Sequence, residues 1–214
     1  MNQNFWGGGH LACRVSSDKL REVADMDTHE LLRRYALGER DFSGICLTGM
    51  DLRGTYLSGV DFSRSHLPGA NFTNAVLNTT NFSEADLSGA NFSQANLFAA
   101  FLSGANLDRA ILQFANLTEA DLSGASLVNA DLSDTLLHLT CCAETNLRGA
   151  NLSGAKMCGA KLWRVNLQDA NLRGADLCDA NLCEANLKGA NMEATDISEV
   201  ALTGAILPQG EVHA

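Results

Sequence analysis

Large apolar residues return at every fifth position of this chain, from Phe42 to Leu207, without insertion or deletion. Of these 34 central residues, 33 are Leu, Phe, Met or Ile, and the exception, Cys142, is itself small and apolar. A period of five matches neither the turn of an α-helix nor the two-residue alternation of a strand. The chain must therefore change direction once per repeat to keep one side chain facing inward, which predicts a coil rather than a set of helices.

The neighbouring positions support this prediction. The residue two before each central residue is Ala in 21 of the 34 repeats, so a small and a large apolar side chain can point inward together. The residue between them is usually Asn or Asp and is expected to face outward. Ser or Thr and then often Gly follow, as in Ser88-Gly89 and Ser123-Gly124. These are turn residues, and Gly adopts positive φ easily.

One such unit cannot bury its apolar side alone, so successive turns must stack and pair their backbones. The repeat rule A-(D/N)-L-(S/T)-G is clearest in residues 85–92 and 170–177. In these segments the chain closely resembles the pentapeptide-repeat family, and the resemblance covers about four-fifths of the sequence. It implies an all-β solenoid: a right-handed quadrilateral β-helix with four repeats per coil and about eight coils.

A coil of 20 residues makes a prediction about the aromatic residues of the interior. Phe42, Phe62 and Phe82 would form one interior column, and Phe72 and Phe92 would form a second column on the opposite side. We expect these rings to stack in register along each column rather than to face one another across a narrow core.

The sequence divides into a flexible start with a helical cap (1–38), a pentapeptide-repeat β-helix (39–210) and a tail (211–214). Ser17 is positioned to cap a short helix ending at Ala24. A second helix is predicted over 28–37, capped by Asp27 and Glu30 and ended by Gly38, and residues 30–40 resemble the lead-in of cyanobacterial family members. This helix either covers the exposed end of the solenoid or binds a partner. Its apolar side is assigned to Leu31, Leu32, Tyr35 and Leu37.

The chain carries a net charge of −10. From Glu39 onward there are 20 acidic and 10 basic residues, and the segment 65–146 has eight acids against the single Arg109. Direct nucleic-acid binding is disfavoured because it needs clustered Lys and Arg. The sequence contains neither a signal peptide pattern nor an apolar run long enough to span a membrane, so we expect a cytoplasmic protein.

No catalytic motif is recognisable, and the five His residues are scattered, so neither enzyme activity nor a cofactor is predicted. Cys158 and Cys178 lie 20 residues apart and would stack on adjacent coils, where a disulfide is geometrically conceivable. Free thiols in a reducing cytoplasm are the alternative. A metal site at Cys178 and Cys183 with a distant His is not supported by the spacing, so no metal site is predicted.

Large apolar residues at outward positions break the repeat rule on one side of the coil. We call this side the Leu117 face, the side built on the central residues Leu57, Leu77, Leu97, Leu117 and Leu137. Exposed apolar clusters often mark a protein interface, although local drift in a tolerant repeat is an equal alternative. The candidate partner-binding residues are Phe98, Leu136, His138 and Leu139 on this side, Phe114 at its leading corner and Phe101 past its next corner, with Tyr56 and Val76 further along the same side.

These observations predict a non-enzymatic protein-interaction or scaffold rod acting on an unidentified protein partner. Some family members protect DNA gyrase by resembling duplex DNA in shape and charge, so an acidic DNA mimic that binds gyrase or another topoisomerase is the alternative. Many of those relatives have loop insertions and a C-terminal dimer interface, whereas this repeat is uninterrupted. A monomer is slightly favoured because Pro208 removes a backbone donor at the end of the repeats, and an end-to-end dimer through the C-terminus is the alternative.

Overall fold

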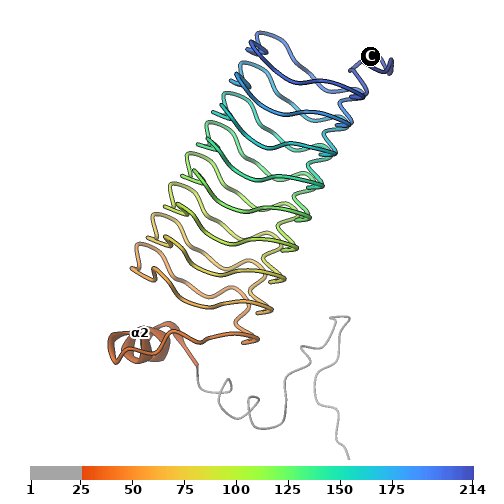
Figure 1. Ribbon diagram of the computed structural model, residues 1–214. Helices are drawn as coiled ribbons and strands as arrows, with labels where there is room; N and C mark the ends of the chain where they lie inside the picture. The colour runs from red at the N-terminus through yellow and green to blue at the C-terminus, as the bar shows by residue number, and fades with distance from the viewer. Residues whose placement is uncertain (1–25) are drawn as a thin grey trace, which may run out of the picture.

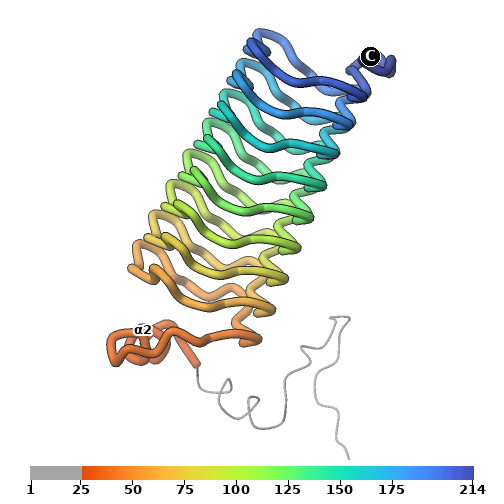
Figure 2. The backbone as a smooth tube through the Cα atoms, in the orientation of Figure 1, coloured from red at the N-terminus to blue at the C-terminus, as the bar shows by residue number. Residues whose placement is uncertain are grey.

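The computed structural model describes residues 26–214. These residues form a short helix followed by a long stack of similar coils, with the helix at one end and the C-terminus at the other (Figure 1). The backbone trace rises from coil to coil with little change in shape (Figure 2). The predicted helix ending at Ala24 and the first part of the predicted leader lie outside the described residues.

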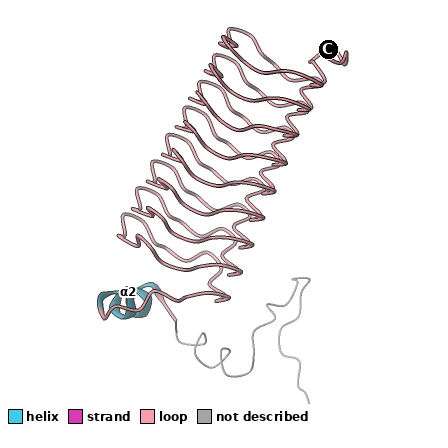
Figure 3. Cartoon of the chain, viewed as in Figure 1, coloured by secondary structure: helices cyan, strands magenta, loops and turns pink. Residues whose placement is uncertain are grey.

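Parallel β-bridges 20 residues apart set the register of the stack. They begin with Asp41 and Asp61 and continue to Asn186 and Ile206, always one residue per side of the coil. Each bridge is held by backbone hydrogen bonds such as Phe42 N to Asp61 O and Asp61 N to Arg40 O, both 2.8 Å long. Four five-residue repeats therefore complete one coil. Extended strands do not form in residues 26–214, where α2 is the only regular element (Figure 3), because each repeat spends two residues on a turn.

The turn at each corner has a left-handed residue two positions after the central residue. This position has φ between 52° and 75° in nearly every repeat, whether it holds Gly or another residue type. Pro68 occupies the preceding position, and Ala70 N closes the turn on Leu67 O at 3.2 Å. Pro at this position and positive φ at the next are the requirements of a type II turn. The expectation of turns after each central residue is confirmed.

The interior consists of the central residues and the small residues two positions before them. Nearly all are buried, including Cys142, the only central Cys. Where Thr replaces Ala, its hydroxyl donates to a backbone carbonyl, either of the previous coil, as Thr135 Oγ1 does to Leu112 O at 2.8 Å, or of its own coil, as Thr55 Oγ1 does to Leu52 O at 2.7 Å. A buried hydroxyl with such a partner avoids the cost of an unsatisfied polar group.

The aromatic end of this interior packs in two directions. Rings stack along each column, with centroids 5.5 Å apart for Phe62 and Phe82 and 4.7 Å apart for Phe72 and Phe92. Rings of opposite columns also meet edge to face, as Phe72 and Phe82 do at 5.6 Å. The predicted stacking along each column is confirmed, and the narrow coil adds edge-to-face pairs across the core, which are themselves favourable.

Helix α2 (Thr28–Ala36) lies against the first coil. Asp27 caps it by accepting a hydrogen bond from Glu30 N at 2.8 Å, and Gly38 follows its end with φ 97°. Leu31 is fully buried, and the hydroxyl of Tyr35 donates to Ser58 O at 3.2 Å. Leu37, predicted on the apolar side, is instead 74% exposed because the helix has already ended at Ala36.

The last residues fold back on the final coil. Val212 forms an antiparallel bridge with Ile206, and His213 N donates to Ala205 O at 2.8 Å. The predicted tail is thus paired with the last repeat and does not leave the rod at Gly210. Within residues 26–214, no helix has the length and apolar character needed to cross a membrane.

Candidate functional site

The 20-residue register places four of the predicted partner-binding residues on the Leu117 face. Phe98 follows Leu97, and Leu136, His138 and Leu139 surround Leu137 two coils later. Phe98 is 37% exposed and Leu139 is 58% exposed, whereas the central Leu97, which directly precedes Phe98, is fully buried. The repeat therefore directs these apolar side chains outward, where no interior packing requires them.

Two of the apolar residues occupy the left-handed corner position. Phe114 has φ 58° and Leu139 has φ 56°, and each is 58% exposed. At every other left-handed corner of residues 41–205 this position holds Gly, Ala or a polar residue. A left-handed conformation costs an L-residue with a Cβ about 1 kcal/mol, and such residues often cluster at functional sites. Folding alone gives no reason for Phe or Leu at these corners.

The remaining predicted residues lie around the corners of the Leu117 face. Phe114 stands at its leading corner, and Phe101 lies past the next corner on the neighbouring side, bridged to Asn81 and Asp121. Ile111, 38% exposed and in the same repeat as Phe114, extends the apolar surface but was not among the predicted residues. Its position normally holds Asn or Asp, which is the signal that would have found it.

The acidic residues of segment 65–146 avoid the Leu117 face. Its outward positions in this segment contain one acid, Glu119. The other seven acids are distributed over the other three sides: Glu84, Asp86, Asp108, Asp121, Asp131, Asp134 and Glu144. Some acids nevertheless border the candidate residues, since Asp121 is bridged to Phe101 and Asp134 stacks one coil beyond Phe114.

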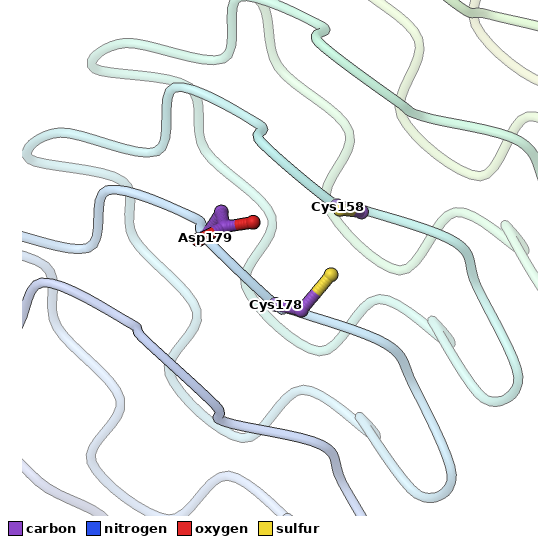
Figure 4. A group of neighbouring side chains, drawn as sticks. All are labelled: Cys158, Cys178 and Asp179. Carbon is purple, nitrogen blue, oxygen red and sulfur yellow. The ribbon is translucent and has the colours of Figure 1, made fainter.

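A second group of chemically distinctive residues lies further along the Leu117 face, where it continues over Met157 and Leu177. The thiols of Cys158 and Cys178 and the carboxylate of Asp179 lie within 4.8 Å of one another. Cys178 and Asp179 are neighbours on one coil, and Cys158 is on the coil before, with the side chain of Cys178 pointing toward it (Figure 4). The stacking is fixed by the hydrogen bond from Gly159 N to Cys178 O, 2.9 Å long.

The protonation of these thiols depends on their neighbours. A hydrogen bond with the Cys158 thiol raises the pKa of Cys178 to about 12, and burial and the Asp176 carboxylate act in the same direction. Asp176 also accepts a hydrogen bond from Cys178 N at 3.2 Å. Burial raises the pKa of the interior Cys142 thiol as well, which makes it a poor nucleophile. The predicted stacking of Cys158 and Cys178 is seen, with both thiols free.

A shallow groove lies where α2 meets the first coils. Its lining includes Thr28, Leu32, Arg53 and Asn74. The guanidinium of Arg53 is already paired with Asp51 at 2.7 Å, so this groove offers little free charge to a ligand.

The repeat regions match a known family model. The model described as pentapeptide repeats matches overlapping segments that run from residue 41 to residue 198. The chain therefore belongs to the pentapeptide-repeat family, whose members are generally structural or interaction proteins rather than enzymes. A search of curated proteins found no match.

One similar solved structure is that of QnrB1, a plasmid-mediated fluoroquinolone resistance protein. It is 18% identical in sequence with a TM-score of 0.68, and the match covers 76% of this chain and 85% of the QnrB1 chain. A second is HetL of the cyanobacterium Nostoc, a protein involved in heterocyst differentiation regulation. It is 33% identical with a TM-score of 0.31, and the match covers 88% of this chain and 100% of the HetL chain. A pentapeptide-repeat protein of the Arabidopsis thaliana thylakoid lumen is also 33% identical, with a TM-score of 0.23. This match covers 60% of this chain and 69% of the Arabidopsis chain. The family and the QnrB1 fold imply a right-handed quadrilateral β-helix.

Proposed function

We propose that this protein is a non-enzymatic interaction rod that binds a protein partner through the apolar part of the Leu117 face. The residues assigned to the interface are Phe98, Phe101, Phe114, Leu136, His138 and Leu139. The observation that carries the proposal is the presence of Phe114 and Leu139 at left-handed corners that elsewhere hold small or polar residues. Other non-Gly residues share this backbone conformation, but within residues 26–214 only these two combine it with a large exposed apolar side chain, and binding is the role that explains that side chain.

The chemistry of this surface fits a protein rather than a nucleic acid. Aromatic and aliphatic side chains with little local charge are typical of the centre of a protein interface. The partner is expected to present a complementary apolar surface. In the free state the protein is expected to be a cytoplasmic monomer.

The alternative is an acidic DNA mimic that binds gyrase or another topoisomerase. It is favoured by the net charge of −10 and by the concentration of acids in segment 65–146. QnrB1 shares the fold, but at 18% identity this likeness extends to the fold alone. Most of these acids lie on the other three sides of the rod, but Asp121 is bridged to Phe101 and Asp134 stacks one coil beyond Phe114.

The test compares two double variants as baits in a pull-down from cells of the source organism, quantified by mass spectrometry. Phe98→Ser with Phe114→Ser removes two aromatic anchors, each expected to contribute about 2 kcal/mol or roughly 30-fold in affinity. We expect the partner captured by the wild-type protein to be lost, with an unchanged circular dichroism spectrum.

Glu84→Gln with Glu144→Gln is the matched acidic variant, since both carboxylates are exposed and share a corner row that contains none of the candidate residues. It should retain the partner. Asp131 is a less suitable choice because its carboxylate accepts hydrogen bonds from Gln113 and Asn151. Capture that survives the Phe changes but not the charge changes would contradict the proposal. A gyrase supercoiling assay with and without a fluoroquinolone would then test the DNA-mimic alternative directly.

A further inference from the structure

We infer that Cys158, Cys178 and Asp179 form a binding site for a thiophilic divalent cation of the Zn²⁺ class. The three ligand atoms already lie within 4.8 Å of one another without any metal. On binding the ion, each thiol would release its proton to solvent, and the resulting two thiolates and one carboxylate are a ligand set that suits Zn²⁺, with a water molecule completing the tetrahedron.

The fold holds this ligand set in place. Cys158 and Cys178 occupy the same position of repeats one coil apart, and the intervening hydrogen bond from Gly159 N to Cys178 O measures 2.9 Å. Asp179 is at the left-handed corner, with φ 55° and its backbone N donating to Ser198 O at 3.0 Å. The ligands thus come from a rigid stack, so binding requires side-chain rotation but no ordering of the backbone.

The surroundings separate the ligands from other groups. Asp176 is engaged with Cys178 N and is therefore a neighbour of the ligands rather than one of them. Leu139 reaches over Gly159, since a Cβ placed on Gly159 would lie 2.9 Å from Leu139 Cδ2. The thiols are half-buried and Asp179 is exposed, so the site is accessible to an entering ion from solvent.

Cys183 shows why the position in the coil matters. It is also a half-buried free thiol directly after a central residue, but it lies past the corner on the neighbouring side. It is not part of the three-ligand group. Cys183 therefore provides a control with the same chemistry and a similar exposure but without the partner thiol.

The experiment is a Co²⁺ titration of the full chain under anaerobic conditions with a phosphine reductant, followed by displacement with Zn²⁺. Wild-type protein should bind one Co²⁺, with a sulfur-to-cobalt charge-transfer band and the visible bands of tetrahedral cobalt. Cys158→Ser and Cys178→Ser should each abolish the charge-transfer band, and Asp179→Asn should weaken binding at least about tenfold. Cys183→Ser should bind as the wild type does.

Melting curves monitored by circular dichroism verify that each variant is folded. Absence of the charge-transfer band in folded wild-type protein would overturn the inference, as would equal loss in the Cys183→Ser variant. Formation of a Cys158–Cys178 disulfide in air, together with failure to bind Co²⁺ under reductant, would also overturn it and assign the pair a redox role instead.

Discussion

The interior and the Leu117 face are built by the same repeats, yet they follow different rules. Leu97 is fully buried, and the adjacent Phe98 is 37% exposed. Inside, each apolar residue is explained by burial, because a five-residue repeat cannot stack without it. Outside, the same residue types remain partly exposed in the free protein, so burial does not fully account for them. Departures from the repeat rule at outward positions can therefore indicate function, whereas at inward positions the need for close packing keeps them rare.

The substitution with the largest expected effect on stability places a charge inside the rod. Leu117→Asp would bury an unpaired carboxylate in a dry interior, at a cost of at least about 3–5 kcal/mol. This is comparable to the entire stability of many domains. We expect loss of soluble, folded protein, measured by expression and circular dichroism. Thr118→Asp, one residue further and outward-facing, should change stability by only about 0.5 kcal/mol. A folded Leu117→Asp protein with an unchanged melting temperature would contradict the inward assignment.

At the N-terminal end of the rod, removing α2 would expose residues that are now part of the interior. Deletion of residues 1–38 removes the buried Leu31 and the hydrogen bonds from Thr28 to Asp51 O and from Tyr35 to Ser58 O. The first coil would then expose apolar side chains and unpaired backbone groups. We expect the truncated rod to keep its circular dichroism spectrum but to associate, as measured by light scattering.

Leu37→Ser serves as the control for this deletion because Leu37 is exposed in the full chain. It should remain a monomer like the wild-type protein. If the truncated protein is also monodisperse and monomeric, α2 does not act as a cap, and a partner-binding role for the helix gains support.

The smallest expected effect concerns backbone strain on the surface. Phe114→Gly should raise the free energy of unfolding by up to about 1 kcal/mol, because Gly adopts positive φ without the penalty of a Cβ. Phe98→Gly, on the same surface but outside the left-handed corner, should lower the free energy of unfolding, because Gly adds conformational entropy to the unfolded chain. Urea denaturation of both variants measures the difference. Equal changes in the two would show that the corner is not strained and would weaken the argument for a functional Phe114.

The period of five made much of this architecture predictable. A central residue such as Leu122 must face inward in every coil, and the Asp27–Glu30 capping pair located α2 within one residue. The spacing of Cys158 and Cys178 predicted their stacking. Asp179 was missed because its neighbours across the corner depend on the turn conformation, and Leu37 was misassigned because helix ends are set by local hydrogen bonds.

By itself, the sequence determined the repeat, its inward and outward positions and its membership of a family, because short-range periodicity fixes which side chains must be buried. The tertiary structure decided which outward residues meet across a corner. The carboxylate of Asp179 joins the two stacked thiols at one place, because lateral distances depend on how the coil turns its corners and how closely the coils stack.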